Sequence, residues 1–167
     1  MFEELGGLPA HPLLVHVVVV MVPLAAIGMI AIALRPQWQR AYGPVVVAFA
    51  GLGFLGALFA AASGEELEEV RQSAGETISA TLRDHAEMGD TAEVLAGIFF
   101  LLVVAWFVVT RWSARVGEER ATKTLRKPKA IAVGLLAVAA LSGVVATYSV
   151  TVTGHNGAKS VWESDQP

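Results

Sequence analysis

Four long apolar stretches constrain this 167-residue chain more than any other feature of its sequence. They run over residues 13–34, 45–62, 94–110 and 130–152. A helix that crosses the ~30 Å hydrocarbon core of a bilayer needs about 20 mostly apolar residues, and each stretch comes near that length. Only 16% of the residues are charged, where a soluble domain keeps about 25%. The sequence therefore predicts an all-α integral membrane four-helix bundle that forms a single domain over residues 1–167.

Positive charge is concentrated in the segments that follow the first and the third apolar stretch. These two segments hold nine of the twelve lysines and arginines, whereas thirteen of the fifteen carboxylates lie elsewhere. Because loops rich in lysine and arginine stay in the cytoplasm, the bias predicts a bacterial inner-membrane protein with both termini exterior. The lipid bilayer is its expected environment. The net charge of −3 gives no basic surface for nucleic acid, so no nucleic-acid partner is expected.

The segment Ser63–Asp84, between the second and third stretches, carries a pattern of its own. Ser63 and Glu66 have the spacing of a capping box, which indicates a helix start. Apolar residues then recur at helical spacing, with acidic residues on the opposite side. We expect an exterior amphipathic helix or two short turns at the outer interface, or else a solvated acidic loop broken at Gly75.

Glycines in the second stretch match a motif that is misleading in this context. Gly51, Gly53 and Gly56 fit the GxGxxG pattern of dinucleotide-binding folds, which has meaning only between a strand and a helix. Inside an apolar span, small residues three and four apart instead favour close packing between helices. The fourth stretch has a comparable face that includes Ala139 and Ala146, so contacts within the bundle or in a homodimer are expected.

Histidines supply the side chains that could carry chemistry, because the chain has no cysteine for a thiolate site or an iron–sulfur cluster. In the predicted topology all four lie at the outer end of the bundle: His11, His16, His85 and His155. An imidazole several residues inside a membrane span is costly to charge. We therefore expect His16 to face the bundle interior in its neutral form.

The local sequence sets different expectations for the other three histidines. Pro12 favours the first helical turn, which leaves His11 just before the helix and free to turn inward. His85 either lies in a turn before a third helix capped near Asp90, or within a helix that begins near Ser79. His155 stands between two glycines, at 154 and 157, where we expect a sharp turn.

Several of these pieces resemble a known family when taken in order along the chain. Residues 8–16, Ser63 with Gly64, His85 and residues 154–162 are similar to the bacterial membrane family called domain of unknown function 2231. The resemblance implies a four-helix membrane domain. In some relatives a similar domain is joined to a Rieske-type iron–sulfur domain, which suggests redox work. This chain has no cysteine and could not hold that cluster itself.

Three functions fit the sequence. The first is a b-type haem with two imidazole ligands, for electron transfer with a redox partner protein, with His16–His85 as the first pair and His11–His155 as the second. The second is a bare zinc, copper or nickel site made by His11, His16, His85 and His155, to which Glu87, Asp90 or Glu93 could add a carboxylate.

The third function is a structural or partner-binding membrane module without a cofactor. A stand-alone enzyme is not expected, because no serine stands in the sequence context of a nucleophile elbow, and no catalytic residue is assigned.

Overall fold

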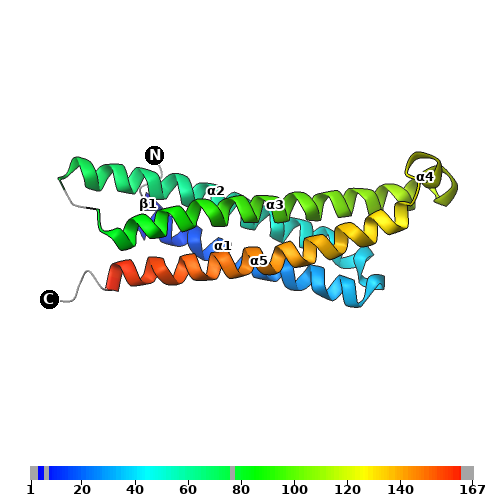
Figure 1. Cartoon of the computed structure of the whole chain (residues 1–167), viewed down its shortest axis with the longest axis horizontal. Helices are drawn as coiled ribbons and strands as arrows, with labels where there is room; N and C mark the ends of the chain where they lie inside the picture. The colour runs from blue at the N-terminus through cyan, green and yellow to red at the C-terminus, as the bar shows by residue number, and fades with distance from the viewer. Residues whose placement is uncertain (1–3, 6–7, 76–77, 163–167) are drawn as a thin grey trace.

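The computed structural model describes residues 4–5, 8–75 and 78–162, with side chains over residues 11–75 and 78–159. It is an elongated bundle of long helices (Figure 1). The long helices are α1 (Ala10–Leu34), α2 (Gln39–Ser73), α3 (Ala80–Val116) and α5 (Pro128–Trp162). The short elements are β1 (Glu4–Leu5), β2 (Leu8–Pro9), the 3-10 helix η1 (Pro36–Trp38) and α4 (Glu118–Thr124). The all-α membrane bundle predicted from the sequence is confirmed, since all four long helices are long and apolar enough to cross a membrane.

The four long helices pack in a closed ring. Helix α1 contacts α2 and α5, and α3 contacts the same two helices from the other side. Large side chains fill the centre, with Trp106, Phe99 and Met29 almost completely buried. Apolar side chains also cover the outside, as at Leu141, which is 69% exposed. Such an apolar outer surface is expected for a bundle whose outer face meets lipid.

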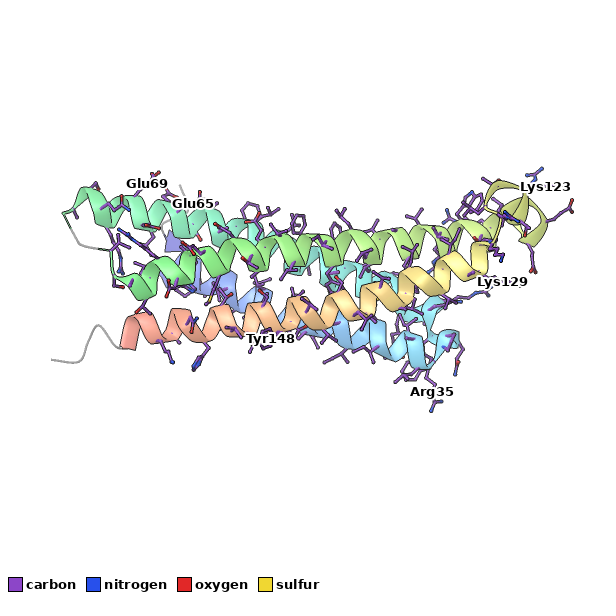
Figure 2. All side chains as sticks on the ribbon, in the orientation of Figure 1. Arg35, Glu65, Glu69, Lys123, Lys129 and Tyr148 are labelled. Carbon is purple, nitrogen blue, oxygen red and sulfur yellow. The ribbon has the colours of Figure 1, made fainter. Side chains whose placement is uncertain are left out.

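Charged side chains are separated between the two ends of the bundle. Figure 2 shows Glu65 and Glu69 at one end and Arg35, Lys123 and Lys129 at the other. We call them the acidic end and the basic end. Helices α1 and α3 begin at the acidic end, where α2 and α5 finish, so both ends of the described chain lie there.

Neither the separate amphipathic element nor the acidic loop expected over Ser63–Asp84 forms, although the break expected at Gly75 is confirmed. Helix α2 continues unbroken through Ser63 to Ser73 and ends beside Gly75, whose φ of +81° favours glycine. The hydroxyl of Ser63 donates to the carbonyl oxygen of Ala60 within α2 (2.9 Å) and caps no helix start. Because nothing before Gly75 breaks the helix, the acidic residues extend α2 beyond its apolar stretch.

Glycines permit the closest contacts between α1 and α2. A Cβ added at Gly53 would stand 2.7 Å from Cγ2 of Val22, and one at Gly56 would stand 3.2 Å from Cγ2 of Val18. Real Cβ atoms essentially never approach within 3.0 Å, so this close approach of the two helices requires glycine at position 53. The interpretation of the GxGxxG pattern as a helix-packing motif is confirmed.

Substitution of Gly53 should therefore weaken the bundle. We expect G53A to lower the free energy of unfolding by about 1–3 kcal/mol, because a methyl group overpacks the contact with Val22. The control is G134A in α5, where an added Cβ meets nothing within 4 Å and alanine favours the helix. Unfolding of both variants in detergent micelles measures the difference. Equal stability of G53A and G134A would contradict the proposed role of Gly53.

Candidate functional site

Two of the four histidines meet at the acidic end of the bundle. His11 lies in the first turn of α1 and His85 in the second turn of α3, and their ring centroids are 6.1 Å apart. The two ring planes are perpendicular. We call His11 and His85 the imidazole pair.

His11 is held against helix α2. Its Nδ1 lies 2.9 Å from the carbonyl oxygen of Ala60 and 3.2 Å from Oγ of Ser63. A carbonyl oxygen only accepts, so Nδ1 carries the hydrogen and donates it. Ser63 is a buried polar residue, 7% exposed. An added Cβ at Gly64 would stand 3.3 Å from Cε1 of His11, so the small residue lets the ring lie close to α2.

His85 is held in the same way against helix α5. Helix α3 begins at Ala80, and the Oγ of Ser79 accepts a hydrogen bond from the backbone N–H of Leu82 (3.2 Å), which confirms the second of the two expected helix starts. The Nδ1 of His85 donates to the carbonyl oxygen of Thr153 at 3.1 Å. An added Cβ at Gly157 would stand only 2.7 Å from Cε1 of the ring.

Polar contacts continue from His85 along the boundary between α3 and α5. The hydroxyl of Thr153 donates to the carbonyl oxygen of Met88 (3.2 Å). The side-chain amide of Asn156 lies 2.9 Å from Sδ of Met88. Together these contacts fix the rotation of α5 about its axis and, with it, the position of the carbonyl group that holds His85.

The imidazole pair is arranged so that both rings share one tautomer. Each Nδ1–H is directed to a backbone carbonyl, which leaves the lone pair of each neutral ring on Nε2. Among the described residues, no hydrogen bond is made by either Nε2. A histidine that ligates a metal typically has its other ring nitrogen bound to a carbonyl or carboxylate in this way.

The expected inward orientation of His16 is wrong. Its side chain is exposed, and its Nδ1 hydrogen-bonds the carbonyl oxygen of Pro12 in its own helix. Five residues separate it from His11, which is roughly 140° around a helix, so only one of the two can face the interior. The contacts of α1 with α2 turn His11 inward and His16 outward.

The expected turn around His155 is also wrong, because α5 continues unbroken to Trp162. The glycines on either side of His155 serve as contact points within the helix, and the His155 side chain is exposed. The structure thus brings together neither His16 with His85 nor His11 with His155. It brings together His11 and His85.

Carboxylates add little to this site. Glu87 and Asp90 are exposed and Glu93 is half-buried. Over residues 4–5, 8–75 and 78–162, no three histidine, aspartate or glutamate side chains are grouped so that they could hold a metal ion. A site at the imidazole pair therefore has two protein ligands to offer.

The position of the His85 ring should be most sensitive to a substitution at Gly157. G157A places a methyl group against the imidazole, so we expect a displaced ring and a loss of about 1–3 kcal/mol in the free energy of unfolding. The control is G154A, one turn earlier, whose Cβ would be 3.5 Å from Val19 in ordinary contact. Unfolding measurements and imidazole NMR shifts check both effects. Unchanged His85 shifts in G157A would show that the contact is unimportant.

Comparison with known proteins gives one family. A family model described as "Predicted membrane protein (DUF2231)" matches residues 7–165. No curated protein and no solved structure matches the chain. The family match spans nearly the whole sequence and agrees with the resemblance carried by its histidine and glycine motifs. The chain therefore belongs to the DUF2231 family of predicted membrane proteins.

Proposed function

We propose that the imidazole pair binds a b-type haem, with Nε2 of His11 and Nε2 of His85 as the two axial ligands. One observation carries the proposal: two rings from facing helices lie 6.1 Å apart, and each donates its Nδ1–H to a backbone carbonyl. Axial imidazoles from facing helices are how helical bundles hold haem iron.

The spacing of the two rings supports a shared ion. Imidazoles that share one ion through nitrogens at ~2.0–2.1 Å hold their ring centroids roughly 5–6.5 Å apart, the longer value for a linear arrangement. The observed 6.1 Å lies within this range.

The number of ligands favours haem over a bare ion. Structural zinc sites use four protein ligands and catalytic ones three. Haem supplies four nitrogens of its own, so two imidazoles complete the coordination of its iron. The described residues gather no third ligand. Haem needs only two protein ligands, whereas a bare zinc ion would need at least one more side chain.

The function that follows is electron transfer at the acidic end. The iron would take up one electron from a donor and pass it to an acceptor, with no bond made or broken in this chain. Exposed Glu87 and Asp90 give the neighbouring surface negative charge, which favours a redox partner protein with a basic docking face.

A second candidate is a structural module without a cofactor. The observation that favours it is that each ring already joins two helices, His11 linking α1 to α2 and His85 linking α3 to α5. On this hypothesis the imidazole pair only links neighbouring helices at the acidic end of the bundle.

Optical spectroscopy of the four histidine variants distinguishes the two functions. We expect protein produced with added haem to show a Soret band and sharp reduced α and β bands typical of two imidazole ligands. H11A and H85A should lose the low-spin spectrum, because each removes an axial ligand. H16A and H155A are matched controls, since both side chains are exposed, and should keep it.

Two results would reject the haem proposal. One is a folded protein that takes up no haem. The other is a spectrum that H16A or H155A changes as much as H11A does. If the imidazole pair only links helices, no variant should show a haem absorption spectrum. H11A and H85A should then unfold at a lower temperature than the unmodified protein.

We further propose that the basic end faces the cytoplasm and the acidic end the exterior of the inner membrane. Nine of the twelve lysines and arginines belong to the segments at the basic end, and such segments are retained in the cytoplasm. The haem would then lie near the outer surface of the membrane.

Single-cysteine labelling tests this orientation cleanly, because the chain has no cysteine of its own. Ala74 at the acidic end and Arg126 at the basic end are both exposed. We expect a membrane-impermeant maleimide to label A74C in intact cells and R126C only after the membrane is broken. The reverse pattern would invert the proposed orientation.

A further inference from the structure

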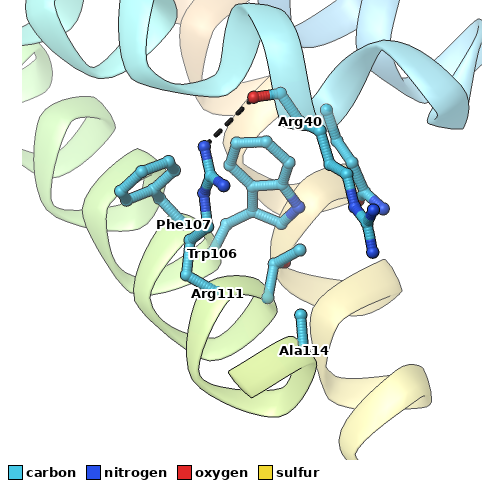
Figure 3. A pocket seen from close by; sticks show the side chains of 7 residues that line it. Arg40, Trp106, Phe107, Arg111 and Ala114 are labelled. Atoms are coloured by element: carbon cyan, nitrogen blue, oxygen red, sulfur yellow. Dashed lines mark hydrogen bonds between the residues drawn. The ribbon is translucent and has the colours of Figure 1, made fainter.

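A cavity of about 90 Å³ opens at the basic end, between α2 and α3. Its walls include Gln39, Arg40, Trp106, Thr110 and Arg111 (Figure 3). The cavity lies at the opposite end of the bundle from the imidazole pair. It combines two cations, an aromatic wall and a buried hydroxyl in one place.

Among the described residues, the two arginines at this cavity have no carboxylate partner. The Arg111 guanidinium lies over the Phe107 ring, 5.1 Å from its centroid, and donates to the backbone carbonyl oxygen of Arg40 at 3.0 Å (Figure 3). Within the described residues, no carboxylate oxygen lies within 4.0 Å of either guanidinium. The ion pairs described at this end use Lys123 and Lys129 instead. The cavity therefore carries positive charge that no carboxylate of the described residues pairs with.

Thr110, in the wall of the same cavity, carries a second unsatisfied group. Its Oγ1 is buried and has no hydrogen-bond partner among the described residues. A buried hydroxyl without a partner is costly, so natural structures rarely leave one without a reason. A ligand oxygen in the cavity would satisfy it and would accept from Arg111 at the same time.

We infer that this cavity binds a phosphate group of an anionic ligand. Guanidinium groups match phosphate oxygens in geometry and charge, and Thr110 adds a neutral donor. A single water needs ~10–15 Å³ of such space, so the cavity has room for a group with several oxygens. Basic pockets at the ends of membrane helices are known to hold lipid head groups. The same chemistry would serve a phospholipid head group or free inorganic phosphate.

The test is native mass spectrometry of the delipidated protein in detergent. Three probes are compared: phosphatidylglycerol, diacylglycerol with the same acyl chains but no phosphate, and inorganic phosphate as a competitor. We expect one phosphatidylglycerol to bind per chain and diacylglycerol not to bind. Competition by millimolar inorganic phosphate identifies recognition of the phosphate alone, and its absence identifies a lipid as the ligand. Both results support the phosphate site.

Variants separate the cavity from general attraction to a basic surface. We expect R111Q to weaken phosphatidylglycerol binding roughly tenfold or more, and T110V severalfold. T110V keeps the side-chain shape, so it remains informative if R111Q fails to fold. R115Q, one turn further along α3 and exposed, is the control and should bind within about twofold of the unmodified protein. Equal losses in R115Q and R111Q, or equal binding of diacylglycerol, would overturn the inference.

Discussion

Every backbone N–H and C=O group in the hydrocarbon core of a membrane must find its partner within the protein, because lipid offers none. This constraint makes each of the four apolar stretches a helix. Helices α2 and α3 have 35 and 37 residues. At 1.5 Å per residue they are about 50–55 Å long and exceed a hydrocarbon core of ~30 Å. Their polar ends rise beyond the lipid, and both candidate sites lie in those end regions.

The features that depend on composition and spacing were predictable from the sequence. Four apolar stretches gave four spanning helices, and the charge distribution appears in the structure as separate acidic and basic ends. The glycines at 53 and 56 were correctly interpreted as helix-packing residues, since both lie close against side chains of α1. The same reasoning placed all four histidines at one end.

The rotation of each helix about its axis could not be predicted. Whether His11 or His16 faces inward depends on how α1 meets α2, and contacts such as Gly53 against Val22 decide it. The partners of the rings are backbone carbonyls of Ala60 and Thr153, which no side-chain pattern reveals. The continuation of α2 through Ser63 and of α5 through Gly154 was also missed, because glycine and acidic residues are common in turns as well as near helix ends.

The two ends of the bundle are built in a similar way. Long helices carry polar groups past the lipid, and small residues or aromatic rings leave room beside them. At the acidic end, Gly64 and Gly157 admit two imidazoles. At the basic end, the rings of Trp106 and Phe107 border a cavity with two arginines. In our proposals the first arrangement holds a haem and the second an anion, so the two sites would differ in chemistry.

Pulsed EPR tests most directly whether His11 and His85 together bind one haem iron. The sample is the oxidised protein, loaded with haem and labelled with ¹⁵N-histidine. Coordinated imidazole nitrogens couple to the unpaired electron of low-spin iron and can be counted. We predict strong coupling from two histidine nitrogens, unchanged when His16 and His155 are both replaced by alanine. Coupling from one nitrogen or from none would contradict a shared site at the imidazole pair.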